Sequence, residues 1–239
     1  MKNMEKVAKV ATKVAVVIVI TLLTIYKALN RLATPKKINA VIDAAITDAM
    51  AELGLKQRPT ISTDTIGVNE DFVMAAGGTI QYKGGFWGDK TITKTECNYI
   101  LKINTNNLKR QLRSYYVAFG NKQAVYDSLY LTVCHELRHM WQYESQWYVG
   151  KKYNDLGDSM QRMLEGHGTL EEEADANAFA TEMATAKGVK ELGEYLDLLQ
   201  RTAGVMFVDK ATIKELREKR IEVTKKYNKV LYIFYKVFC

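Results

Sequence analysis

Histidine, cysteine and proline are scarce in this chain of 239 residues, and each scarcity narrows what the protein can be. There are three histidines, three cysteines and only two prolines. Cys97, Cys134 and Cys239 are an odd number at unrelated spacings, which argues against a disulfide framework and favours a reducing compartment. With so little proline and no Gly/Ser-rich stretch, a disordered spacer between domains is not expected.

A hydrophobic run near the N-terminus is too short to be a clear membrane span. Val14 to Tyr26 is uncharged for 13 residues, whereas about 20 apolar residues cross a bilayer. Lysines precede it, as in a signal peptide or short anchor, but Lys27 follows it and no Ala-x-Ala cleavage site is present. Two interpretations stay open: a membrane anchor or uncleaved signal, and a helix buried against the body or a partner. We therefore expect a cytoplasmic or membrane-associated protein.

The net charge of +7 is concentrated at the two ends of the chain. Residues 1–37 carry eight Lys/Arg and one Glu, and residues 209–239 carry nine basic and four acidic side chains. The middle of the chain is mildly acidic. Basic ends suit an anionic membrane or nucleic acid, although solvated helix faces explain them equally well. Nucleic acid is an unlikely partner because no binding motif accompanies the charge.

The pattern of apolar and turn-forming residues predicts an α+β fold. Helical periodicity follows Pro35 and stops at Gly54, and short β-rich runs occupy the stretch from Pro59 to Asn104, separated by turn-formers such as "AAGG". Helices are predicted at 105–119, 121–146, 155–165, 169–187, 189–203 and 211–237. The expected architecture is a small, mostly antiparallel sheet followed by a helical subdomain. We divide the chain into a hydrophobic, basic helix (1–33), a main domain (34–204) and a basic, aromatic helix (205–239).

The stretch "TVCHELRHMWQY" carries the first chemical signal. His135 and His139 are one helical turn apart, beside the apolar face, so their imidazoles can converge on one ion. Glu136 is offset around the helix and can reach an open coordination position without being a ligand. Cys134 points off this face and is interpreted as a packing residue.

A second stretch, "GHGTLEEEADANAFATEMA", supplies carboxylates. Thr169 and Glu172 form a capping box that predicts a helix starting at Leu170. Glu171 and Asp175 then lie one turn apart, so that the first can be a third metal ligand and the second can hold a ligand histidine in place. Two alternatives remain open for the third ligand. One is Glu172 or Glu173, and the other is His167.

Together "HELRH" and "EEEAD" resemble the gluzincin clan of zinc metallopeptidases, most closely the minigluzincins and the ImmA/IrrE-type enzymes, over roughly residues 97–184. The resemblance implies a Zn2+ cofactor held by His135, His139 and Glu171, with Glu136 as general base. It also implies that Asp175 supports a ligand histidine. The candidate oxyanion or substrate residues are His167, Tyr143 and Tyr148.

The strand-like run "NYILKINTNNL" occupies the place where these enzymes keep an edge strand for the substrate peptide. An ordinary sheet strand is the favoured interpretation of the two. The sequence as a whole leads us to expect a zinc metalloendopeptidase, a hydrolase of peptide or protein substrates, with terminal helices that contact a membrane or partner. The alternative is a non-catalytic structural or interaction protein that retains the metallopeptidase-like fold.

Overall fold

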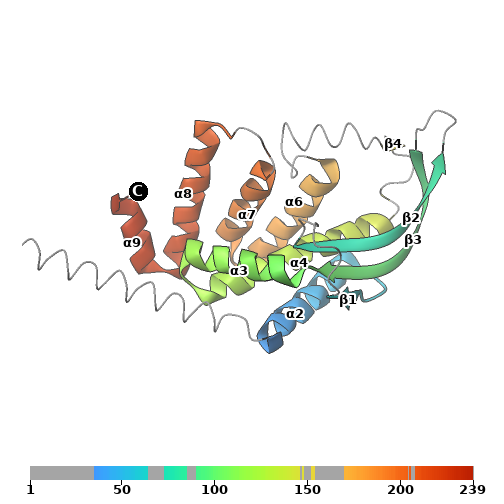
Figure 1. Ribbon diagram of the computed structural model, residues 1–239, viewed down its shortest axis with the longest axis horizontal. Coiled ribbons are helices and arrows are strands. Elements are labelled where there is room, and N and C mark those ends of the chain that lie inside the picture. The colour runs from blue at the N-terminus through green and yellow to red at the C-terminus, as the bar shows by residue number, and fades with distance from the viewer. Residues whose placement is uncertain are drawn as a thin grey trace, which may run out of the picture. The chain divides into compact units, whose positions relative to one another are not determined.

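The computed structural model describes residues 35–63, 73–84, 90–145, 147, 152–153, 170–203, 205 and 208–238. The N-terminal run, the helix expected at 155–165, His167 and Tyr148 lie outside these ranges. The helices are α2 (Pro35–Leu53), α3 (Thr105–Phe119), α4 (Lys122–Glu144), α6 (Glu171–Ala186), α7 (Lys190–Thr202), α8 (Lys210–Tyr227) and α9 (Lys229–Phe238). The strands are β1 (Thr60–Ser62), β2 (Met74–Gly84), β3 (Lys90–Ile103) and β4 (Lys152–Tyr153) (Figure 1).

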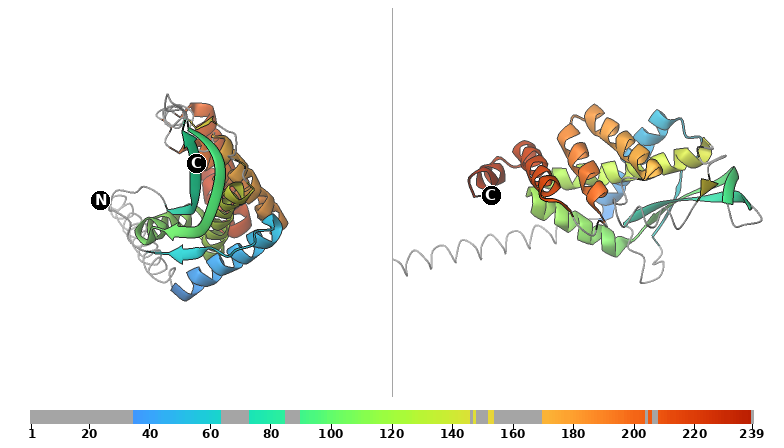
Figure 2. Two further views of the ribbon diagram at one scale, coloured as in Figure 1. Left: turned by 90° about the vertical axis from the view of Figure 1, so that its right-hand side faces the viewer. Right: turned by 90° about the horizontal axis from the view of Figure 1, so that it is seen from above.

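The sheet is mixed, with strand order β1-β3-β2 and β4 also paired to β3. The β1–β3 pair is parallel, whereas β2 and β4 pair with β3 in the antiparallel sense. The structure is therefore compatible with the expected α+β fold class, but the sheet is antiparallel only in part. Beyond α4, β2 and β3 continue as a curved ribbon, with β4 paired to β3 at its far end (Figures 1 and 2).

The run "NYILKIN" is an interior strand. Ile100, Leu101 and Lys102 of β3 pair with β1 on one side and with β2 on the other. The edge-strand interpretation of this run is thus wrong, and the ordinary-strand interpretation is confirmed. Within the described ranges, β1, β2 and β4 each pair on one side only, with β3 as the partner.

The segment "AAGG" does not form the expected turn but lies inside β2. The pairing with β3 continues through Ala75 and Ala76, and its register shifts between Gly77 and Thr79. A shift of this kind accommodates the small residues as a bulge within the strand. The prediction failed because glycine marks bulges as well as turns.

The helix α4 is the centre of the core. Its side chains are buried on almost every side, including an unbroken buried run from Ala124 to Leu131. It contacts α3, α6 and α7 on the helical side of the fold and β2 and β3 on the other. Figure 2 shows it enclosed among these elements. A helix so completely covered can hold polar groups away from bulk water.

The helix boundaries around α3 follow the sequence signals. The Asn104 side chain accepts hydrogen bonds from Asn106 N and Asn107 N at the start of α3, and Asn121 does the same for α4. Gly120 ends α3 at φ 61°, a left-handed conformation that glycine adopts without strain. A Cβ at Gly120 would also lie 2.6 Å from the Asn228 side chain.

The predicted helix 211–237 is two helices. The helix is interrupted at Asn228, which has an extended backbone (φ −151°, ψ 90°). Its Nδ2 donates to Gly120 O at 3.1 Å, and its Oδ1 accepts from Leu231 N and thereby caps α9. A contact with a residue over 100 positions away therefore sets this break, and helical periodicity alone could not reveal it.

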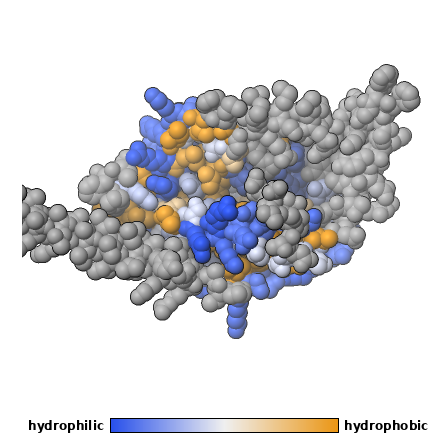
Figure 3. All heavy atoms as spheres, in the orientation of Figure 1, coloured by the Kyte–Doolittle hydropathy of each residue, from blue (hydrophilic) through white to orange (hydrophobic). Residues whose placement is uncertain are grey.

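In the described part of the chain, none of the helices is both long and apolar enough to cross a bilayer. Figure 3 shows apolar side chains over α7 and α8 and hydrophilic side chains over α3 on the same face.

Candidate metal centre

Three ligand-type side chains from α4 and α6 converge at one point. The Nε2 atoms of His135 and His139 lie 3.2 Å apart. A carboxylate oxygen of Glu173 lies 3.2 Å from the first of these atoms, and its other oxygen lies 3.6 Å from the second. The three ligand atoms fall within 4.8 Å of one another. All three side chains are almost buried.

This arrangement fits a metal ion. Ligand atoms placed about 2.0–2.1 Å from a tetrahedral zinc lie roughly 3.3–3.4 Å from each other, which is close to the separations seen here. Two facing imidazole nitrogens, moreover, need a proton or a cation between them, because two lone pairs repel. Two histidines and one carboxylate leave a further coordination position for a small molecule.

The carboxylate in this cluster is Glu173, not Glu171 as expected. Glu171 is exposed at the first position of α6, whereas Glu173 is 8% exposed. The helix begins one residue later than predicted, with Leu170 as the N-cap residue and no side-chain capping bond. Leu170 is buried and anchors the helix start, so the third helical position rather than the first faces the histidines.

Asp175 reaches the histidines through Gln142. The Gln142 side chain accepts at Oε1 from His139 Nδ1 (2.8 Å) and donates from Nε2 to an Asp175 carboxylate oxygen (2.8 Å). Its Nε2 also donates to Glu172 O at 2.9 Å. The direct Asp175–histidine contact that the sequence suggested is therefore replaced by a link through an amide.

Arg138 holds Asp175 in place. Its guanidinium donates two hydrogen bonds to the carboxylate, at 2.8 and 2.9 Å, and lies 3.8 Å over the Trp141 ring. Burial would raise the pKa of Asp175, but hydrogen bonds from Arg138 and Gln142 outweigh burial and lower it. Asp175 thus stays ionised and acts as a fixed acceptor for the amide.

Glu136 is buried beside the cluster and reaches the sheet. One of its carboxylate oxygens accepts a hydrogen bond of 2.8 Å from Ala76 N of β2. Burial raises its pKa, and the neighbouring His135 and His139 oppose that rise. A carboxylate whose pKa is raised in this way is a stronger base than an exposed one.

His139 is strongly basic in the metal-free protein. Burial lowers its pKa, but the hydrogen bond to Glu173 and the negative charge of Glu136 outweigh burial and raise the pKa to about 9. The same negative charges that stabilise a proton would stabilise a cation in its place.

Behind His135 lies a cavity of about 170 Å³ between α3, α4, α6 and α7. His135 and Asn177 both line it. Each has a buried nitrogen, Nδ1 and Nδ2 respectively, without a hydrogen-bond partner among the described residues. Unpaired buried donors cost about 1–3 kcal/mol each, so water in this cavity is the simplest way to satisfy them.

Among the described residues, the remaining candidates are not part of the three-residue cluster. Cys134 is fully buried, and burial raises its pKa to about 12, in keeping with a packing role. Tyr143 is half-buried near the end of α4. The other two oxyanion candidates, His167 and Tyr148, lie outside the described residues.

Gln142 and Asn177 were missed by the sequence reasoning, although a signal for each exists. Gln142 follows His139 by three residues, so it occupies the same helix face one turn later. Asn177 follows Glu173 by four residues, the spacing that was applied from Glu171 to Asp175. Taking Glu173 as the ligand would have led to Asn177.

Comparison of the chain with protein-family models, curated proteins and solved structures found no match.

Proposed function

We propose that this protein is a zinc-dependent metallopeptidase whose metal is held by His135, His139 and Glu173. The observation that carries the proposal is the convergence of these three side chains within 4.8 Å, next to a buried carboxylate. Two histidines and a glutamate are a ligand set of catalytic zinc sites, which keep one position open. The HELRH motif supports the same assignment, because it contains both histidine ligands and the buried carboxylate, Glu136.

The chain's own groups would then divide the work of peptide hydrolysis. Zinc, when bound, supplies a Lewis acid that activates water and polarises the scissile carbonyl. Glu136 takes the proton from the attacking water and passes it to the leaving amine. Its buried position keeps this proton exchange away from bulk solvent.

The strand β2 is the proposed place for the substrate backbone. The Ala76 N–H faces Glu136, so this part of β2 lies at the catalytic carboxylate. Since β2 pairs on one side only within the described ranges, an extended peptide can add to its other edge. This assigns to β2 the role that the sequence had suggested for "NYILKIN".

The first test is the zinc content of the purified protein beside Glu136→Gln, followed by a peptidase assay. Glutamine retains an oxygen that accepts from Ala76 N but is no base. We expect about one zinc per chain in both proteins and a loss of activity of about 10²–10⁴-fold in the variant. Wild-type protein that takes up no zinc when zinc is supplied would refute the proposal.

A non-catalytic protein with a structural metal is the second candidate. The hydrogen bond from Ala76 N to Glu136 favours it, because it gives this carboxylate a role in joining α4 to the sheet. In that case the thermal stability of the protein would increase as zinc binds. Neither the wild type nor Glu136→Gln would then cleave a diverse peptide library.

A further inference from the structure

We infer that Gln142 is the positioning residue of the metal centre, because it orients His139 and fixes the start of α6 at the same time. This inference rests on the proposed zinc site and adds to it a residue outside the ligand set. The HELRH pattern does not include Gln142.

The Gln142 amide is fully buried and uses both ends of its side chain. Its exposed fraction is 0%. Oε1 accepts from His139 Nδ1, and Nε2 donates both to Asp175 and to the main-chain oxygen of Glu172. A buried amide with its donors and acceptor used in this way has one orientation that satisfies its neighbours.

The first of these bonds determines which nitrogen of His139 is available to a metal. In the neutral imidazole, which is the form that binds a metal, an acceptor at Nδ1 holds the single ring proton there and leaves Nε2 unprotonated. Nε2 is the atom that points to His135 and Glu173. Gln142 therefore selects the tautomer that binds a cation at the shared point.

The second set of bonds acts on the other helix. Glu172 O belongs to the residue just before Glu173, so a hydrogen bond to it limits movement of the first turn of α6. Arg138 donates two hydrogen bonds to Asp175 and so fixes the carboxylate that accepts from the Gln142 amide. One side chain of α4 thereby sets the separation between a histidine ligand and the carboxylate ligand.

Glutamine suits this position better than a carboxylate. A glutamate would accept from His139 equally well but would face Asp175 and Glu172 O without a donor, and like charges close together are unfavourable. An amide supplies the acceptor and the donors together. Asp175, in turn, needs to be the carboxylate because Arg138 neutralises it.

The experiment measures zinc affinity by competition with a chelator, and the visible absorption spectrum of the cobalt(II)-substituted protein. Gln142→Met removes both functions of the amide at nearly constant volume. Gln123→Met is the matched control, because it makes the same change on an exposed side chain of the same helix. The double change Gln142→Glu with Asp175→Asn exchanges the two groups and restores a donor–acceptor pair while keeping the acceptor for His139.

We expect Gln142→Met to weaken zinc binding by about 10–100-fold, as loss of a partner of a ligand histidine typically does, and to change the cobalt spectrum. Gln123→Met should match the wild type, and the double variant should recover part of the loss. Wild-type affinity and spectrum in Gln142→Met would overturn the inference while leaving the zinc site intact. Equal losses in Gln142→Met and the double variant would also overturn it. A wild type that binds no zinc would instead refute the proposed function.

Discussion

At the scale of single residues, the cluster shows how a buried anion changes its neighbours. Glu173 is nearly buried and lies against two imidazoles. A buried carboxylate needs a positive partner, and in the metal-free protein a protonated histidine can supply it. This explains why the pKa of His139 rises although burial alone would lower it.

The raised pKa of His139 predicts a pH-dependent stability of the metal-free protein. The folded state binds this proton more tightly than the unfolded state. The contribution of protonated His139 to the free energy of unfolding is therefore complete below the ordinary histidine pKa of 6.5. It is lost as the pH rises to about 9. We would measure urea unfolding of the chelator-treated wild type and of His139→Gln. The free energy of unfolding of the wild type should fall relative to that of the variant between about pH 6.5 and about 9. Parallel curves across this range would contradict the assignment of the proton to His139.

At the scale of elements, the helix α6, which carries Glu173, packs closely against α7. Gly193 of α7 provides this close approach. A Cβ there would lie 2.7 Å from the Ala184 Cβ and 3.3 Å from the Thr181 Cα on α6. The second contact is with backbone, so the neighbouring helix cannot retreat by a side-chain rotation alone.

Gly193→Ala should destabilise the protein even though alanine favours helices. The gain in helix propensity is about 1 kcal/mol, whereas overpacking of a tight interface costs about 1–3 kcal/mol. We expect a net loss of about 1 kcal/mol in urea unfolding. Ala184→Gly in the same chain should recover part of the loss beyond additivity, because it removes the atom that the new methyl group meets. Strictly additive effects of the two changes would show that α6 and α7 are not in contact here.

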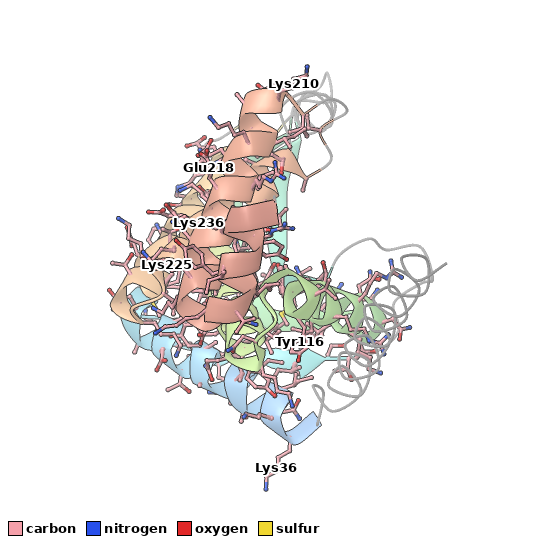
Figure 4. All side chains as sticks on the ribbon, turned by 90° about the vertical axis from the view of Figure 1, so that its left-hand side faces the viewer. Lys36, Tyr116, Lys210, Glu218, Lys225 and Lys236 are labelled. Carbon is pink, nitrogen blue, oxygen red and sulfur yellow. The ribbon has the colours of Figure 1, made fainter. Side chains whose placement is uncertain are left out.

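At the scale of the whole molecule, the C-terminal end presents apolar side chains beside lysines. Val230 and Ile233 of α9 are 80% and 60% exposed. The final 17 residues contain lysines but no acidic residue. Figure 4 looks onto this face and labels Lys225 of α8 and Lys236 of α9. An exposed apolar face with basic neighbours suits the surface of an anionic membrane.

We therefore predict that the protein sediments with vesicles that contain phosphatidylglycerol more than with vesicles of phosphatidylcholine alone. The double change Val230→Asp with Ile233→Asp should lower the bound fraction several-fold, since it adds negative charge and removes apolar contact. Ile213→Asp, at a 54% exposed position on α8, is the control and should have a smaller effect. Equal binding of the control and the double variant would assign any membrane affinity to another part of the chain.

Most of the fold was predictable from local pattern, and the exceptions share one cause. Helix ends at Gly54 and Gly120 follow from the left-handed conformation that glycine tolerates. The break at Asn228 and the course of "AAGG" within β2 were not predictable in this way. Both depend on contacts with elements distant in the sequence, namely Gly120 for the first and β3 for the second.

By itself, the sequence determined that His135 and His139 share a helix face beside a glutamate, because a spacing of four residues fixes that geometry whatever surrounds the helix. It narrowed the third ligand only to His167 or a run of three glutamates, since successive residues of a helix differ by about 100° in direction. The tertiary structure selected Glu173, because the buried Leu170 sets where α6 starts and how it rotates against α4. It likewise brought in Gln142, whose role exists only where two helices meet.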